Sequence, residues 1–227
     1  MKYIHHHLGL GDHIICNGIV RNLRELHGEV FVFTKHHNFK NVEHMYRDDD
    51  KIIVYSTGED ADVDKYIDIN KIPQENVVKI GFKRLWEIGA PSFDVGFYML
   101  AGLPFEDRFT KFKYERDLIK EEEVYNELNP SGEPYIFIHD DPRRGFIMDR
   151  NRINTGLKII ENDTRFGIFD FLGVIEKAEE VHVMQSSMKD LINSYKFDKP
   201  KFFFHNYVRG YDGFLDSVGL NTYTKLY

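Results

Sequence analysis

An aspartate follows two glycines in the N-terminal segment HHHLGLGDHII, residues 5–15. Glycine lets the backbone turn sharply, and the apolar residues after Asp12 recur at helical spacing. Asp12 is therefore expected at the start of a helix and at the carboxyl edge of a parallel sheet, where open α/β sheets bind ligands. It can act there on a substrate, or it can only cap the helix, because Asp is a preferred N-cap residue. The loop by itself favours the cap.

Two other kinds of glycine loop bind phosphate groups, and this sequence matches neither. A nicotinamide or flavin fingerprint needs a third small residue where Ile14 stands, and an acid where Thr34 and Lys35 end the second strand. The spacing G-x-x-x-x-G-K-S/T of a P-loop does not occur in the chain. The sequence therefore disfavours an oxidoreductase, excludes a P-loop nucleotide site and predicts no cofactor.

A second group of reactive side chains lies in HDDPRRGFIMDR, residues 139–150. Arg143, Arg144 and Arg150 follow the end of a strand, and a planar guanidinium group binds two phosphate oxygens at once. We predict that these arginines bind the phosphates of a substrate. The alternative is a charged loop in which they pair with the aspartates of the same stretch, Asp140, Asp141 and Asp149.

Gln185, Ser186 and Ser187 end a strand and begin a helix. The free N–H groups at such a helix start attract anions, so this position is predicted to add to the phosphate site. The simpler alternative is an ordinary serine cap. The two roles are compatible.

Strand and helix patterns alternate along the chain, which predicts parallel sheets. The fold class is therefore α/β, with two Rossmann-like parallel-sheet halves: residues 1–128, a linker at 129–134, and residues 135–227. Strands are predicted at 2–7, 29–34, 51–56, 66–70, 76–82, 135–140, 180–185 and 201–205. Helices are predicted at 12–27, 39–46, 92–101, 115–128, 169–178 and 187–195.

Composition narrows the class of protein. The 227 residues are 42% hydrophobic and 30% charged, as in soluble globular proteins. The net charge of −7 argues against a nucleic-acid surface. No apolar run approaches the roughly 18 residues of a membrane-spanning helix, and no secretory leader is visible. Cys16 is the only cysteine. It is expected to be a buried apolar residue in a protein of the reducing cytoplasm.

Two stretches are weighed as metal sites and set aside. Asp48–Asp50 is similar to a metal-binding D-x-D motif, but these acids precede a strand instead of following one, so a solvated turn is predicted. The eleven histidines, among them His36 and His37, lack the spacing of zinc ligands. No metal is predicted.

The stretch GLGDHIICNGIVRNLREL, residues 9–26, resembles the opening of the heptosyltransferase-like GT-B glycosyltransferases. The resemblance implies that Asp12 is the catalytic base, with Gly9, Gly11 and His13 beside the substrate. MLAGLP (99–104) is similar to the family's helix end before its interdomain segment, whereas its D-T-G-x-x-H stretch is missing. EVHVMQSSMKDLI (180–192) and the arginine loop look more like fucosyltransferase-like GT-B proteins, whose loop has an H-x-R-R-x-D arrangement.

The sequence therefore predicts a compact, metal-independent, inverting glycosyltransferase with an active cleft between its halves. It would move a sugar from a nucleotide-sugar donor to an acceptor hydroxyl of a glycan, a lipid-linked glycan or a small molecule. Tyr207 or Tyr211 is considered for stacking on the donor base. The alternative is a non-catalytic nucleotide- or sugar-phosphate-binding module, which needs the arginine loop and the serines but not Asp12.

Overall fold

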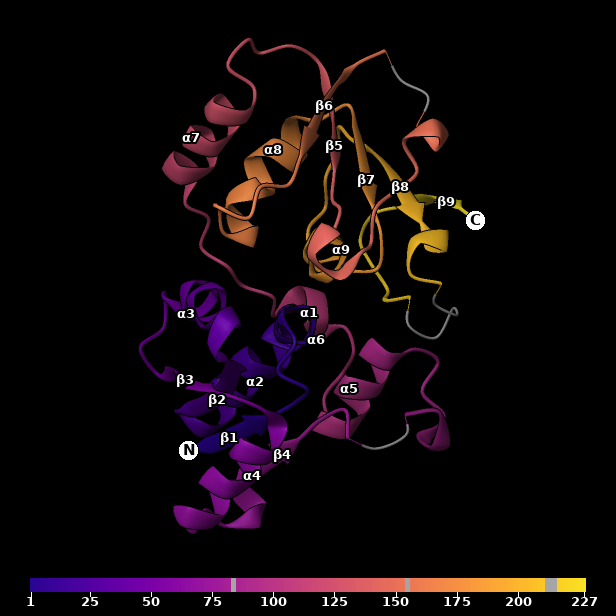
Figure 1. Ribbon diagram of the computed structural model, residues 1–227. Helices are drawn as coiled ribbons and strands as arrows, with labels where there is room; N and C mark the ends of the chain where they lie inside the picture. The colour runs from indigo at the N-terminus through magenta and orange to yellow at the C-terminus, as the bar shows by residue number, and fades with distance from the viewer. Residues whose placement is uncertain (83–84, 154–155, 211–215) are drawn as a thin grey trace. The chain divides into compact units, whose positions relative to one another are not determined.

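The computed structural model describes residues 1–82, 85–153, 156–210 and 216–227, and the chain divides into two compact units (Figure 1). The first unit runs from Met1 to Glu115 and includes a short stretch around Ser217, and the second begins at Arg116. Each unit holds its own parallel sheet. The predicted fold class, α/β with two Rossmann-like parallel sheets, is confirmed.

The first unit has the strand order β3-β2-β1-β4, and all neighbouring strands are parallel. The chain passes from β1 to β2 on one side, while β4 pairs with β1 on the other, so the strand order reverses beside β1. Its elements are β1 (Lys2–His5), α1 (Leu10–Ile15), α2 (Asn17–His27), β2 (Val30–Lys35), α3 (Phe39–Tyr46), β3 (Ile52–Thr57), α4 (Asp60–Ile69), β4 (Val77–Lys79), α5 (Phe93–Ala101) and α6 (Asp107–Thr110).

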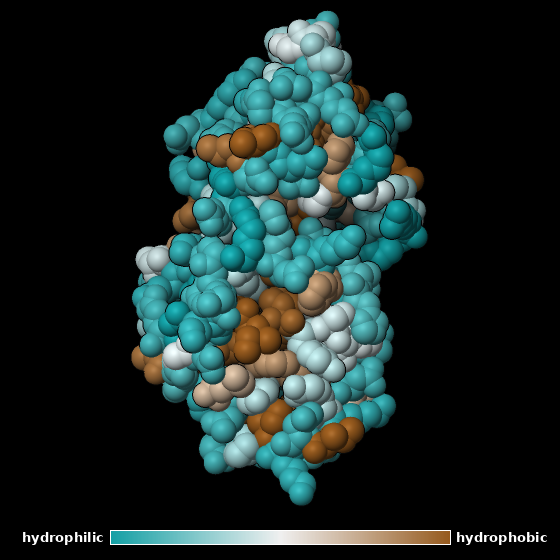
Figure 2. Space-filling view, turned by 90° about the vertical axis from the view of Figure 1, so that its left-hand side faces the viewer, coloured by the Kyte–Doolittle hydropathy of each residue, from teal (hydrophilic) through white to brown (hydrophobic). Residues whose placement is uncertain are grey.

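The central strand β2 is buried on both faces, as its continuous apolar sequence predicts. Phe31 and Phe33 pack with Val63 and Ile67 of α4, and the alternate residues of β2 point to the face that α2 and α3 cover. The edge strand β3 exposes Ile53. Figure 2 shows hydrophobic side chains gathered on this side of the first unit.

The second unit has the strand order β6-β5-β7-β8-β9, again parallel throughout. Here the order reverses between β5 and β7, because β5 leads to β6 on one side while the later strands follow on the other. The elements are α7 (Leu118–Leu128), β5 (Tyr135–Ile138), β6 (Lys158–Glu161), α8 (Leu172–Lys177), β7 (Glu180–Val183), α9 (Ser187–Asn193), β8 (Lys201–His205) and β9 (Tyr223–Leu226).

The two faces of the second sheet are covered differently. On one face the Tyr135 hydroxyl donates to the carbonyl of Val174 in α8, at 2.5 Å. On the other face Ile136 and Ile138 pack with Met148 from the segment that follows β5. In the described part of this segment the chain forms only short 3-10 turns, at 142–144 and 150–152. A loop, and not a long helix, therefore lies against this face.

One predicted strand is wrong. Residues 66–69 belong to helix α4, and Asn70 is its C-cap. Within the sequence YIDIN, residues 67–70 alternate apolar and polar side chains over four positions, which imitates a strand. The buried residues of α4, Val63 and Ile67, are four apart and therefore lie on one helix face. The segment is helical because a helix places Val63 and Ile67 together against the aromatic side chains of β2, Phe31 and Phe33.

Other boundaries also differ. The helix predicted at 12–27 is two helices that meet at Cys16, and the first begins at Leu10. The predicted linker 129–134 lies within the second unit, after α7. The edge strands β6 and β9 and the short α6 are absent from the prediction. Cys16 is buried, as predicted, and burial raises the pKa of its thiol well above the ordinary value.

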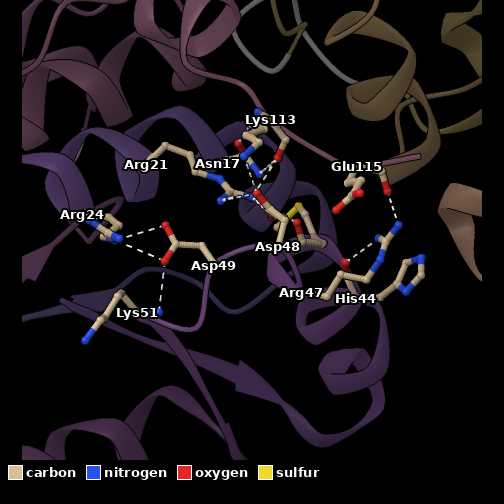
Figure 3. A network of polar contacts seen from close by, with 11 residues as sticks. Asn17, Arg21, Arg24, His44, Arg47, Asp48, Asp49, Lys51, Lys113 and Glu115 are labelled. Carbon is tan, nitrogen blue, oxygen red and sulfur yellow. Dashed lines mark hydrogen bonds and ion pairs between the residues drawn. The ribbon is translucent and has the colours of Figure 1, made fainter. Parts of the chain in front are cut away.

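The turn of three acids before β3 is held by cations of the same unit (Figure 3). The carboxylate of Asp48 lies 2.6 Å from Arg21 and 2.7 Å from Lys113, and Asp49 lies 3.0 Å from Arg24. Only Asp50 is exposed. The predicted solvated turn is wrong for the first two acids, since Arg21 and Arg24 are one turn apart on α2 and meet them.

Candidate functional site

Asp12 lies in the first turn of α1, at the carboxyl end of β1, and is partly buried. The helix N-cap is Gly9, whose carbonyl accepts the N–H of His13 at 3.1 Å. Asp12 is therefore not the cap that the sequence favours. A Cβ atom on residue 9 would lie 2.6 Å from Oδ2 of Asp12, so a larger residue there would push this flexible carboxylate out of its position. Gly11 is the second residue of α1.

The turn before Asp12 contains a non-glycine residue in the left-handed region. Leu8 has φ 57° and is fully buried. Its N–H donates to Nδ1 of His6 at 3.2 Å, and its carbonyl accepts from the Asn38 amide at 3.0 Å. Its side chain packs with Phe33 in the core. The strained residue is therefore held from three directions, and such strain clusters at functional sites.

His13 is predicted to contact the substrate, and its position contradicts this role. Its ring is fully buried and packs edge-on against His6, with ring centroids 4.3 Å apart. Burial lowers the pKa of His13 well below the ordinary value and that of His6 to about 3. Both rings are therefore neutral core groups. The residue after Asp12 points inward because α1 turns that side to the sheet, which the glycine motif does not reveal.

The arginine loop lies beyond the carboxyl end of β5, next to the point where the strand order reverses. Arg150 contacts Asp140 at 2.7 Å and Glu161 at 2.6 Å. It is therefore already neutralised by two carboxylates. These contacts agree with the alternative of an internal ion pair, and the role of Arg150 with phosphate stays a prediction.

Arg143 and Arg144 are the exposed arginines of the loop. Arg144 contacts Asp141 through Nε at 2.5 Å. Within the described residues, its two terminal NH₂ groups have no hydrogen-bond partner. Arg143 makes one long contact, 3.3 Å, to the hydroxyl of Thr164. These two guanidinium groups remain able to bind an anion.

Arg209 is a further cation that the sequence prediction does not include. It donates to the carbonyl of Gln185 at 2.7 Å and lies 4.7 Å from the ring centroid of Phe146. Arg144 lies over the same ring at 5.8 Å. Phe146 therefore brings Arg144 and Arg209 near one another, although they are 65 positions apart in sequence. Cation contacts with an aromatic ring orient guanidinium groups.

Ser186 is the N-cap of α9, as the simpler alternative states. Its hydroxyl accepts from the N–H of Lys189 at 3.4 Å and donates to the carbonyl of Met184 at 3.2 Å. Ser187 is the first residue of the helix and is partly buried. The buried Oε1 atom of Gln185 has no hydrogen-bond partner within the described residues. Gln185 and Ser186 thus sit beside Arg209, and their role with phosphate stays a prediction.

Three further observations concern metal ligands, membrane helices and the two tyrosines considered for base stacking. Among the described residues, no group of three or more His, Cys, Asp or Glu is arranged to hold a metal ion. Within the same ranges, no helix is both long and apolar enough to cross a membrane. Tyr207 is partly buried and bonded to His205, whereas Tyr211 lies outside the described residues.

No protein-family model matches the chain, and no curated protein matches it by sequence. Its structure is similar to that of the glycosyl transferase family 9 protein from Veillonella parvula, with TM-score 0.59 and 10% identity, over 99% of this chain and 85% of that one. It is also similar to ADP-heptose LPS heptosyltransferase II of E. coli, with TM-score 0.58 and 8% identity, over 100% and 90% of the two chains. At these identities the likeness shows a common fold, the two-sheet GT-B arrangement.

Proposed function

We propose that the protein is a metal-independent, inverting glycosyltransferase that uses a nucleotide-sugar donor and a hydroxyl-bearing acceptor. The observation that carries the proposal is the likeness, over nearly the whole chain, to two structures named as glycosyl transferases. The position of Asp12 at the carboxyl end of β1 adds support, because α/β sheets bind ligands at that edge and at the reversal of strand order.

In this proposal Asp12 accepts the proton of the acceptor hydroxyl while the oxygen attacks the anomeric carbon and the nucleoside diphosphate leaves. A carboxylate is a weak base toward a resting hydroxyl, so the proton moves late, when the oxygen has begun to bond. The fixed backbone of Leu8 supports such a role, since it holds the turn that precedes Asp12 in one conformation.

Arg143 and Arg144 are proposed to bind the donor diphosphate and to stabilise its charge as it leaves. The exposed guanidinium groups support this role, because each can donate two hydrogen bonds to phosphate oxygens. In enzymes that use a metal ion at this step, the cation supplies the same positive charge. Arg209, oriented by Phe146, is proposed as a third donor.

Calorimetric titration with nucleoside diphosphates and nucleotide sugars tests this function. We expect one class of nucleotide to bind, and we expect Arg144→Ala to weaken it by about 1.5–3 kcal/mol, the contribution of a hydrogen bond to a charged group. Arg24→Ala is the matched control, since Arg24 also pairs through Nε with an aspartate but lies in α2. Absence of binding to any nucleotide would exclude the proposed function. Unchanged affinity in both Arg143→Ala and Arg144→Ala would move the phosphate site elsewhere.

A further inference from the structure

A row of four polar side chains crosses the loop-covered face of the second sheet. Nε2 of His182 lies 3.3 Å from the carboxylate of Glu180, and Nδ1 of His182 lies 2.9 Å from Nε2 of His205. Nδ1 of His205 lies 3.0 Å from the hydroxyl of Tyr207. That hydroxyl accepts the backbone N–H of Asp149, at 3.0 Å. The row therefore connects the interior of the sheet to the arginine loop.

The chemistry of these groups gives the row one direction. A carboxylate only accepts, so Nε2 of His182 must carry a hydrogen that it donates to Glu180. In a neutral His182 the other nitrogen, Nδ1, accepts from Nε2 of His205. Nδ1 of His205 must then accept from the hydroxyl of Tyr207. Every group in the neutral row thus has a defined tautomer or rotamer.

Added protons disturb this order. One proton can be accommodated on Nδ1 of His205, whose Nε2 still donates to His182, if Tyr207 turns its hydrogen away from the ring and its oxygen accepts instead. A second proton places N–H groups of His182 and His205 face to face at the 2.9 Å contact. The row then has to open, because two donors cannot share a hydrogen bond. The last residue of the row is Tyr207, whose hydroxyl accepts the backbone N–H of Asp149 in the loop.

The surroundings also favour the neutral row. Both rings are nearly or fully buried, and burial lowers the pKa of His182 and of His205 to about 4. The charged groups that act on them are Arg150 and Arg152 of the loop, Asp140 after β5, and Glu180 on β7 itself. The strands on either side place apolar residues in register with the two rings: Ile138 of β5 beside His182, and Leu226 of β9 beside His205.

The loop segment that the row holds is compact. The guanidinium of Arg152 lies 4.3 Å from the ring centroid of Tyr207, and Asp149 caps the 3-10 turn at 150–152 by accepting from the N–H of Asn151 at 3.0 Å. Arg150 in the same turn joins Asp140 and Glu161. Movement of Tyr207 would therefore displace the whole turn and not a single side chain.

We propose that Glu180, His182, His205 and Tyr207 form a proton-sensitive latch on the arginine loop. In the neutral state the latch holds the turn at 149–152 against β8, and protonation of its imidazoles releases that turn. The latch does not depend on the proposed transferase activity, because its parts and their contacts all lie in the second unit. If the loop also binds a nucleotide, the latch sets how well the loop is ordered for it.

Amide hydrogen exchange measured by NMR at neutral pH tests the mechanical connection. Tyr207→Phe removes the hydroxyl and leaves both imidazoles, so we expect the Asp149 amide to exchange about tenfold faster, the scale of one lost hydrogen bond. The amide of Val181 in the sheet should keep its protection. Tyr223→Phe is the matched control, since Tyr223 lies on β9 of the same sheet and its hydroxyl donates to Oδ1 of Asn193 in α9, at 2.9 Å. Unchanged exchange at Asp149 in Tyr207→Phe would overturn the latch.

A second measurement tests the sensitivity to protons. On acidification from about pH 7 to about pH 4.5, protection of Asp149 should fall more than that of Val181 in the unmodified chain. His205→Asn should abolish this difference, because an Asn side-chain oxygen near the position of Nδ1 can still accept from Tyr207 but does not titrate. Parallel loss of protection at Asp149 and Val181 in the unmodified chain would show general acid unfolding and would overturn the proposal.

Discussion

At the scale of single residues, mutation of Asp12 distinguishes a glycosyltransferase from a non-catalytic binding module. We expect Asp12→Asn to fold, to bind donor and to lose turnover by about 10²–10⁴, the usual contribution of a general base. The cost in stability should be small, about 0.3–1 kcal/mol, because Asn keeps the size and the oxygen acceptor of the side chain while the mutation removes a charge from the first turn of α1. Single-turnover sugar transfer and thermal unfolding are the two measurements.

The control for this variant is Asp62→Asn. Asp62 also lies in the first turn of a helix, α4, and accepts the N–H of Glu59 at 3.1 Å. It should lose a comparable small amount of stability and no turnover. If Asp12→Asn transfers sugar at the normal rate, Asp12 has only a structural role, and the non-catalytic alternative gains support.

The residue scale also shows what a sequence can and cannot predict about a site. The location of Asp12 after the first strand follows from two glycines and a helical pattern, and the structure has it there. The burial of His13 and the pairing of Arg150 with Glu161 depend on helix rotation and on the neighbouring strand β6. Neither the helix rotation nor the neighbouring strand can be read from the residues around His13 or Arg150, so these two contacts could not be predicted.

At the scale of elements, a fully buried ion pair joins α5 and α6 in the first unit. Asp94 and Arg108 contact one another with both side chains 0% exposed. The carboxylate also accepts the N–H groups of Val95 at 3.0 Å and Val218 at 2.8 Å. A buried pair can contribute little net stability, but loss of one partner leaves an uncompensated charge in the core.

We therefore expect Asp94→Asn to destabilise the protein by about 3–5 kcal/mol, the usual effect of breaking a buried pair. Urea unfolding of the single variant gives this value. The double variant Asp94→Asn, Arg108→Met should recover a large part of it, because it removes the isolated charge. A single variant as stable as the unmodified chain, or a double variant less stable than the single, would contradict the explanation.

Helices and strands were predictable where their hydrophobic pattern is long, and they were missed where that pattern is short. The apolar centres of β1, β2, β5, β7 and β8 all lie in predicted strands. The edge strands β6 and β9 are only four residues long and expose residues such as Ile159, so they lack the longer apolar run by which the edge strand β3 could be predicted. The row from Glu180 to Tyr207 depends on the register between β7 and β8, which a sequence does not contain.

At the scale of the whole molecule, the buried histidines set the response to acid. Burial lowers the pKa of His5, His139, His182 and His205 to about 4 and that of His6 to about 3, and it lowers the pKa of His13 as well. In the unfolded chain each titrates near its ordinary value of about 6.5. Between these values the unfolded state binds more protons than the folded state.

Acidification therefore lowers the stability of the folded protein. The contribution of these neutral histidines to stability is complete above about pH 6.5 and decreases as the pH falls toward the folded-state values. Each histidine that is charged only in the unfolded chain contributes a slope of about 1.4 kcal/mol per pH unit. Carboxylates titrate mostly below this window, so the histidines dominate the slope between about pH 6 and 5.

We therefore expect the free energy of unfolding, measured by urea denaturation, to fall between about pH 6 and 5 with a slope of more than two protons. His6→Asn should lower this slope by about one proton, since Asn does not titrate and its oxygen can still accept the N–H of Leu8. His27→Gln, at an exposed position, should leave the slope unchanged. A stability that does not change across this window would show that the buried rings are already charged in the folded protein, and it would remove the reason for a neutral His182–His205 pair.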